Sequence, residues 1–311
     1  MGLFSNNKKL CPICNNPTPR LLSTKVEGVP ICKECAAKIF LPDGSLDQMS
    51  LDEFRQYIEF YEDNKELRDA FSETYSYNFG FFDTTLLLDV PNRLFRFFNS
   101  GDGLVMGAAN LKSFRILEDD KPLFESGMST LICHKSDVPD RINEMAPLIT
   151  QFGMELREYE MWEQMEEMRR ERNGQDNDRR PYRTRPTFDA QLPFQHFNIE
   201  ITLEHPYWSI FTKSINAPDF STTDPSVVSY MQEYNQKTED MHKLAANLMQ
   251  IICPGAGERQ EGGASAAGAA IPAAAAGGSA ADEIQKYKAL LDAGAITEEE
   301  YAAKKRQLLG I

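Results

Sequence analysis

The sequence predicts an α+β protein built from several modules along one chain of 311 residues. Three observations lead to this expectation. Two C-x2-C pairs lie within the first 40 residues, strand-like runs begin at residue 74, and an Ala/Gly-rich stretch separates residues 282–311 from the rest. The length exceeds one typical domain of about 100–200 residues. A hydrophobic content of 41% allows a real core and excludes a wholly disordered chain.

The charge of the chain is unevenly distributed. The formal net charge is −14, which argues against bulk electrostatic binding to DNA, RNA or anionic lipid. Residues 1–40 carry a net +4, which leaves −18 for the remainder. No run approaches 18 consecutive apolar residues, and the polar N-terminus does not read as a signal peptide. We therefore expect a cytoplasmic protein.

The four N-terminal cysteines have the spacing of a zinc ribbon, assigned to residues 1–40. Cys11 and Cys14 form one C-x2-C hook, and Cys32 and Cys35 form a second one after 17 intervening residues. Thiolates spaced this way can occupy adjacent corners of a tetrahedron with Zn–S distances of about 2.3 Å. The alternatives are two disulfides or incidental core thiols, and a cytosolic location disfavours disulfides. We expect one structural Zn2+, because four thiolates leave no position for water.

A connecting segment, residues 41–73, is predicted to be mainly helical. Ser50 and Glu53 have the spacing of a capping box, and the apolar pattern that follows continues to about Asp69. We expect this helix to pack the zinc module onto the main domain.

Residues 74–253 are predicted to form an antiparallel β domain that ends in a helix. Asp224-Pro225 begins a long helix through Ile252, whose apolar stripe is assigned to packing on the sheet, with a dimer seam as the alternative. The strand runs, separated by turn residues, are Thr84–Val90, Arg93–Phe98, Leu111–Glu118, Pro122–Glu125, Phe197–Glu204 and Tyr207–Asn216.

A charged insertion at about residues 135–190 interrupts this domain. Met154–Arg172 is predicted to be a solvated helix or half of an antiparallel pair with Ile142–Phe152. An Arg-rich segment follows and contains Arg179, Arg180, Arg183 and Arg185. One interpretation is contact with an acidic partner, including the Glu-rich helix of the same chain, and the other is a solvated excursion.

The C-terminal part is predicted to be a flexible linker, residues 254–281, followed by a helical hairpin, residues 282–311. Gly294 stops the first helix and Thr297 caps the second. About thirty residues cannot bury enough surface to be stable alone. We therefore expect a protein partner, either a second copy in a homo-oligomer or a larger protein assembly. The predicted contact residues are Leu290, Leu291, Ile296, Tyr301 and Leu308.

Three segments resemble known bacterial families. The stretch EIQKYKALLDAGAITEEEYAAKKRQLL resembles the SHOCT domain, a short C-terminal helical hairpin that implies oligomerisation or partner docking. The cysteine module followed by a helix and a β-rich region resembles the DUF4428 family, which has no established activity. The phrase LLLDVPNRLFRFF…LKSFRILEDDKPLFES is similar to strands of PH-like domains.

The residue pattern does not suggest an enzyme. Four histidines are scattered without metal-ligand spacing, and the common nucleotide-binding and hydrolase motifs are absent. Cys133 and His134 are neighbours on an expected strand, so they should face opposite sides. We expect a non-enzymatic zinc-binding adaptor that assembles through its C-terminal hairpin. The alternatives are a nucleic-acid-binding protein that uses the ribbon and Arg179–Arg185, and a peripheral membrane protein that uses the PH-like domain.

Overall fold

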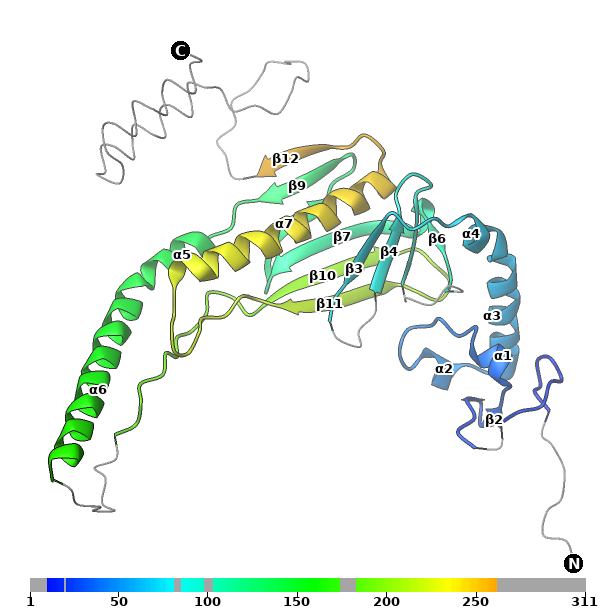
Figure 1. The fold of residues 1–311 in the computed structure, drawn as a ribbon. Helices are drawn as coiled ribbons and strands as arrows, with labels where there is room; N and C mark the ends of the chain where they lie inside the picture. Colours follow the sequence, from blue (N-terminus) through cyan, green and yellow to red (C-terminus); the bar gives the residue numbers. More distant parts are fainter. Residues whose placement is uncertain (1–9, 20, 81–84, 98–102, 174–182, 262–311) are drawn as a thin grey trace, which may run out of the picture. The chain divides into compact units, whose positions relative to one another are not determined.

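The computed structural model describes residues 10–19, 21–80, 85–97, 103–173 and 183–261 (Figure 1). The chain divides into two units, Met1–Gly263 and Ala264–Ile311, and every described residue belongs to the first. The described residues form a mixed α+β fold with three sheets, which confirms the predicted α+β class.

The N-terminal region of the unit is small and folds around the cysteines and one long helix. That helix, α3, begins with the predicted capping box of Ser50 and Glu53. Its buried face shares a hydrophobic core with the cysteine hooks. The elements are β1 (Lys25–Val26), β2 (Val29–Pro30), α1 (Lys33–Ala36), α2 (Ser45–Gln48), α3 (Leu51–Asp63) and α4 (Lys65–Ala70).

The predicted helix to about Asp69 is confirmed in its extent, because α4 ends at Ala70, but it is not continuous: it is broken at Asn64, between α3 and α4. The Asn64 side chain is buried and both donates a hydrogen bond to the backbone of Val105 and accepts one from it. Its Nδ2 donates to the Val105 carbonyl at 2.8 Å, and its Oδ1 accepts from the Val105 N–H at 3.0 Å. This pairing fixes the helix pair to the body, and its partner lies 41 residues away in the sequence.

Two larger sheets form the body of the unit. A four-stranded sheet has the order β3-β4-β5-β6 and a six-stranded sheet has the order β11-β10-β7-β8-β9-β12. All neighbouring pairs are antiparallel except β9 with β12. The strands are β3 (Tyr75–Asn78), β4 (Thr85–Asp89), β5 (Leu94–Phe97), β6 (Met106–Gly107), β7 (Leu111–Glu118), β8 (Lys121–Ser126), β9 (Thr130–His134), β10 (His196–Leu203), β11 (Ile210–Asn216) and β12 (Gly257–Glu261), with a 3-10 turn at Ala108–Asn110.

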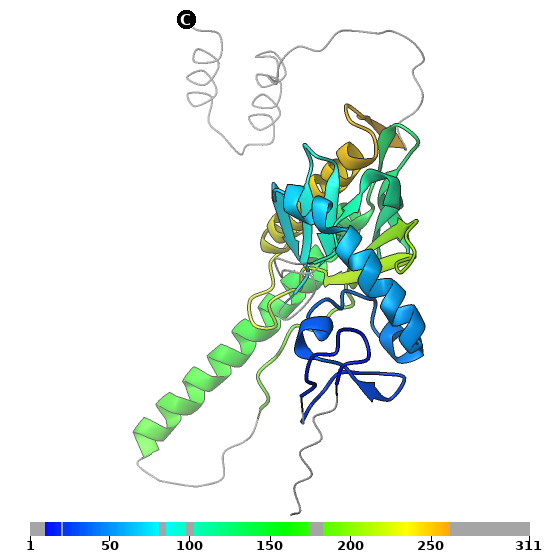
Figure 2. The ribbon, with the colours of Figure 1, turned by 90° about the vertical axis from the view of Figure 1, so that its right-hand side faces the viewer.

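The main hydrophobic core lies between these sheets and the helix α7 (Val227–Ile252). Strand β10 shows why the sequence folds this way, because alternate residues from Phe197 to Leu203 are buried and those between them are more exposed. Helix α7 packs against β7, β8 and β9, and Figures 1 and 2 both place it along the larger sheet. The sheet-packing interpretation of its apolar stripe is therefore confirmed. Arg93 closes the end of α7 by donating to the carbonyls of Ile251 and Ile252 at 2.9 and 2.8 Å.

A carboxylate is buried under α7, beside the main hydrophobic core. Glu118 at the end of β7 is 4% exposed, and it accepts hydrogen bonds from Tyr234 on α7 at 2.6 Å and from Ser136 at 2.7 Å. Burial raises the pKa of Glu118, although both hydrogen bonds act in the opposite direction.

This raised pKa predicts a pH-dependent stability. The folded state keeps the Glu118 proton to higher pH than the unfolded chain does, so this group's contribution to stability falls as pH rises from the unfolded pKa through the folded pKa. Glu118→Gln should remove that slope and raise the unfolding midpoint more at pH 7 than at pH 4, as measured by urea unfolding. Asp120→Asn, an exposed site on the following turn, is the control. An equal shift at both pH values for Glu118→Gln would contradict the prediction.

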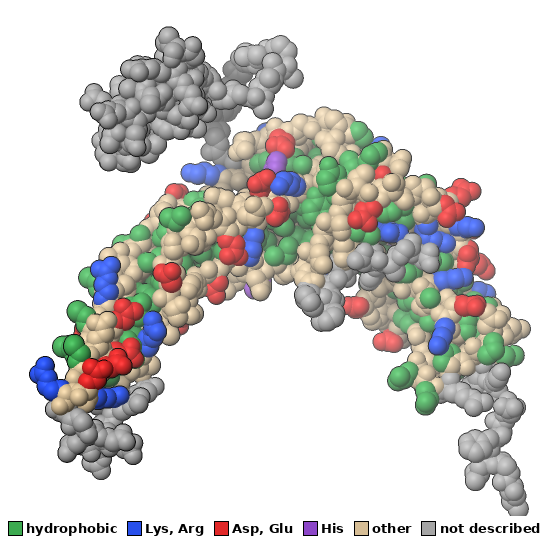
Figure 3. Space-filling model, in the orientation of Figure 1, with side chains coloured by type: hydrophobic (Ala, Val, Ile, Leu, Met, Phe, Trp, Pro, Cys, Tyr) green, Lys and Arg blue, Asp and Glu red, His purple; other side chains and the backbone are tan. Residues whose placement is uncertain are grey.

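The insertion forms one short and one long helix. Helix α5 spans Val138–Glu144 and α6 spans Ala146–Asn173, so the alternative of an antiparallel helical pair is wrong. Residues 183–194 run back beside α6, with Phe188 packed on Phe152 at a ring-centroid distance of 5.5 Å (Figure 1). Along α6, charged and hydrophobic side chains are interspersed at the surface (Figure 3), and the exposed hydrophobic ones include Met154, Met161, Met165 and Met168.

The predicted linker, residues 254–281, begins too early. Gly257–Glu261 form β12, which pairs in parallel with β9 at the edge of the larger sheet. Its five residues carry no apolar side chain, so neither hydrophobic alternation nor β-propensity marks them as a strand. Residues 262–281 of the predicted linker and the predicted hairpin, residues 282–311, lie outside the described residues.

Candidate metal centre

The first cysteine hook is a tight turn. An isolated bridge joins Leu10 to Pro17, and inside it the Cys11 N–H donates to the Asn16 carbonyl at 2.9 Å while the Asn15 N–H donates to the Cys11 carbonyl at 2.9 Å. Asn15 has a positive φ of 60°, a conformation that Asn tolerates better than most residues. These constraints turn the chain sharply and direct both thiols of the hook to the same side.

The second hook follows a hairpin and opens a helix. Strands β1 and β2 pair around Glu27 and Gly28, both with positive φ, and the connection favours Gly because it has no Cβ. Cys32 is then the N-cap of α1, and its sulfur accepts a hydrogen bond from the Cys35 N–H at 3.4 Å. The first turn of the helix thereby brings the thiols of Cys32 and Cys35 together.

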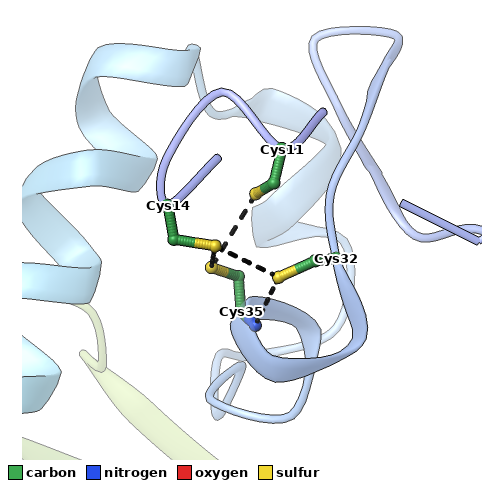
Figure 4. A group of neighbouring side chains, drawn as sticks. All are labelled: Cys11, Cys14, Cys32 and Cys35. Carbon is green, nitrogen blue, oxygen red and sulfur yellow. Dashed lines mark hydrogen bonds between the residues drawn. The ribbon is translucent and has the colours of Figure 1, made fainter. Parts of the chain in front are cut away.

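The four sulfurs converge on one point (Figure 4). Sγ–Sγ distances are 3.3 Å for Cys14–Cys32, 3.5 Å for Cys14–Cys35 and 3.8 Å for Cys11–Cys35, and all four atoms lie within 4.8 Å of one another. A disulfide would need about 2.05 Å, so the cysteines are free thiols and the disulfide alternative is not adopted. A tetrahedron with Zn–S bonds of about 2.3 Å puts sulfurs about 3.8 Å apart. The donor set and its spacing therefore fit a metal such as zinc.

The surroundings of Cys11 and Cys35 shift the pKa values of these two thiols in opposite directions. Burial would raise the pKa of Cys11, but backbone hydrogen bonds from Cys32 and Cys14 outweigh it and lower this pKa to about 7. Burial raises the pKa of Cys35, and the neighbouring thiols of Cys14 and Cys32 add to that effect. Only the thiolate ligates a metal, so loading this cluster displaces protons.

The four-cysteine cluster is part of a hydrophobic core. Cys11, Cys32 and Cys35 are at most 3% exposed and pack with buried side chains of α3 such as Phe54 and Tyr57. Four thiolates would complete the shell of a tetrahedral ion and leave no open position for a substrate, which is the arrangement of structural sites.

The other predicted site residues have different outcomes. The five partner-contact residues Leu290, Leu291, Ile296, Tyr301 and Leu308 lie outside the described residues, as do Arg179 and Arg180. Arg183 and Arg185 form ion pairs with Glu158 and Glu160 of α6 at 3.1 and 3.7 Å. Two of the arginines suggested for an acidic partner thus contact the Glu-rich helix of their own chain.

Sequence reasoning missed a second group of possible metal ligands. Cys133, His242 and Glu258 lie on β9, α7 and β12, and their ligand atoms are within 4.8 Å of one another. Cys133 and His134 are neighbours on β9 and have different surroundings, as predicted, so only Cys133 belongs to this group. Cys133 is buried in the core, whereas His134 Nε2 lies 3.5 Å from Glu125 Oε2. No sequence spacing could have joined three residues from such distant positions.

Comparison with known proteins identifies one part of the chain. Residues 282–309 match a class of short C-terminal modules. They are recognised as SHOCT, the Short C-terminal domain, as the sequence resemblance predicted. Neither the curated proteins nor the solved structures include a significant match to the chain. Among the described residues, no helix has both the length and the apolar character needed to cross a membrane.

Proposed function

We propose that the protein is a non-enzymatic adaptor that holds one structural zinc ion and joins copies of itself, or partner proteins, through residues 282–309. The observation that carries this proposal is the SHOCT match within a unit separate from the sheets and the metal centre. About thirty residues bury too little surface to be stable alone, so a contact partner would contribute to their stability.

The architecture of the adaptor is proposed to be ribbon, PH-like domain and tethered hairpin. The hairpin of β1 and β2 between two cysteine hooks supports a zinc ribbon of the DUF4428 kind. Two largely antiparallel sheets closed by α7 support a PH-like domain. The parallel strand β12 is an addition to that pattern.

The proposed mechanism is multivalent. Residues 262–281 have the Ala/Gly-rich composition of flexible linkers, with an expected span on the order of 25 Å. Such a tether raises the effective concentration of one module near another without imposing a rigid geometry.

Removal of the C-terminal unit is predicted to abolish self-association. Light scattering at micromolar concentration should give an oligomeric mass for the full chain and a monomeric mass for residues 1–263. The truncation belongs after residue 263, because removal at 253 would also delete β12. Equal masses for the two proteins would contradict assembly through this unit.

Point variants in the full chain provide the matched control. Leu290→Asp with Leu291→Asp should reproduce the truncation, whereas Ile271→Asp in the linker should leave the mass unchanged. If both proteins in the truncation pair are monomers, affinity capture with the Leu290/Leu291 variant as the blank tests for a different protein partner. DNA binding that falls steeply with salt would instead favour the nucleic-acid alternative, and co-sedimentation with anionic vesicles would favour the membrane alternative.

A further inference from the structure

Cys133, His242 and Glu258, called the Cys133 cluster below, come from three elements that meet at one edge of the larger sheet. Strand β9 supplies Cys133, α7 supplies His242 and β12 supplies Glu258. The cluster is separate from the four N-terminal cysteines and belongs to the hydrophobic core of the body, in which Cys133 is 4% exposed.

Strand register puts two of the donors on the same side of the sheet. Leu131 and Cys133 alternate with more exposed residues on β9, so both face the core under α7. In the parallel pairing of β9 and β12, Glu258 lies beside Leu131, which directs it to the same side as Cys133. Phe124 of β8 lies opposite Cys133 and its ring is 5.3 Å from that of His242, so the imidazole packs over this part of the sheet.

The three donor atoms are close enough for a single ion to draw them together. His242 Nε2 lies 3.0 Å from Glu258 Oε1, and every pair of ligand atoms in the cluster is within 4.8 Å. Thiolate, imidazole and carboxylate are together a donor set that suits Zn2+, whereas Mg2+ and Ca2+ prefer oxygen ligands alone. Three protein ligands leave a fourth tetrahedral position. The half-exposed His242 and Glu258 give solvent access to that position.

A bound cation also accounts for two features that the fold alone leaves unexplained. Strand β12 has no apolar side chain to hold it on the sheet, and coordination by Glu258 would anchor it. The Glu258 carboxylate also lies within 4.8 Å of the buried Cys133 sulfur, and a divalent ion between a thiolate and a carboxylate would offset their negative charges.

We propose that Cys133, His242 and Glu258 form a second metal site, which binds a zinc-type divalent ion with water as the fourth ligand and ties β12 to α7 and β9. The site is more open than the four-cysteine centre, so its ion exchanges more readily. The site contains no residue of the SHOCT module, so its test is independent of the test of the proposed adaptor function.

Metal stoichiometry tests the proposal. The reduced full-length protein is titrated with Zn2+ against a chromophoric chelator, and Co2+ spectra are recorded in parallel. We expect two ions per chain for the unmodified protein. Cys133→Ala should bind one, and His242→Gln and Glu258→Gln should weaken the second ion by more than the about 10–100-fold that substitutions of outer-shell residues cost. Cys253→Ala, which removes a free cysteine outside both clusters, should retain two.

Hydrogen exchange of β12 gives a second readout that does not depend on Cys133→Ala folding. Zn2+ should slow exchange of Gly257–Glu261 in the unmodified protein and in Cys253→Ala, but not in His242→Gln. That variant changes a side chain that is 36% exposed, so the fold should tolerate it. A single bound ion in the unmodified protein, or two ions in His242→Gln with unchanged protection of β12, would overturn the proposal.

Discussion

Chelation of zinc from the four-cysteine centre is expected to unfold the N-terminal core while leaving the body folded. Three of the four cysteines are buried members of that core, and without an ion their thiols lie next to one another in a small hydrophobic cluster. Apparent zinc-binding free energies in zinc-finger peptides are about 10–16 kcal/mol. This is more than the roughly 3–5 kcal/mol of stability that the packed core of so small a module supplies. Hydrogen exchange should therefore show residues 10–41 losing protection while α7 retains it.

Substitution of one ligand should have the same effect as chelation. Cys35→Ser is expected to release the ion and deprotect residues 10–41, and addition of a chelator to this variant should have little further effect there. Cys253→Ser, a free cysteine at the end of α7, is the matched control and should behave as the unmodified protein does. Protection of residues 10–41 that survives both chelation and Cys35→Ser would show that packing, rather than metal, holds this region.

Local spacing explains the part of the site that the sequence could predict. Each C-x2-C pair is closed by one turn, and the geometry that joins its two thiols depends on residues at most five positions apart, such as Cys11 and Asn16. The capping box of α3 and the strand predicted at Phe197–Glu204 are equally local, and both are confirmed. Such features depend on backbone periodicity, so they can be predicted without knowledge of the remote contacts.

The parts that could not be predicted depend on remote partners. The break at Asn64 depends on the backbone of Val105, and β12 is a strand only because β9 offers it an edge. The Cys133 cluster joins positions 109 and 16 residues apart that no regular spacing connects. Arg93, with a positive φ of 57°, bonds to carbonyls at the end of α7 more than 150 residues later. Tertiary contact overrides local propensity at each of these points.

Trp208→Ala is expected to cost about 3–5 kcal/mol of unfolding free energy, the range typical of a buried Trp→Ala change. Trp208 is 6% exposed, and its ring lies 5.1 Å from that of Phe97 in the main core. Its Nε1–H donates to the Phe40 carbonyl of the N-terminal core at 3.1 Å. The neighbouring Tyr207 packs against both cores, with its ring 5.0 Å from that of Tyr57 on α3.

Because Trp208 joins the N-terminal core to the main core, its substitution should also uncouple the unfolding of the two cores. Hydrogen exchange at α3 and α7 is measured as the urea concentration rises. In the unmodified protein both helices should lose protection at the same urea concentration, whereas in Trp208→Ala α3 should lose it at a lower concentration than α7. Trp162→Ala is the matched control, since Trp162 is the other of the two tryptophans and lies on the charged helix α6 outside both cores. It should cost under about 1 kcal/mol, as surface substitutions usually do. Equal losses for the two tryptophan variants, with α3 and α7 still unfolding together, would mean that the cores are coupled through Asn64 and Val105 instead.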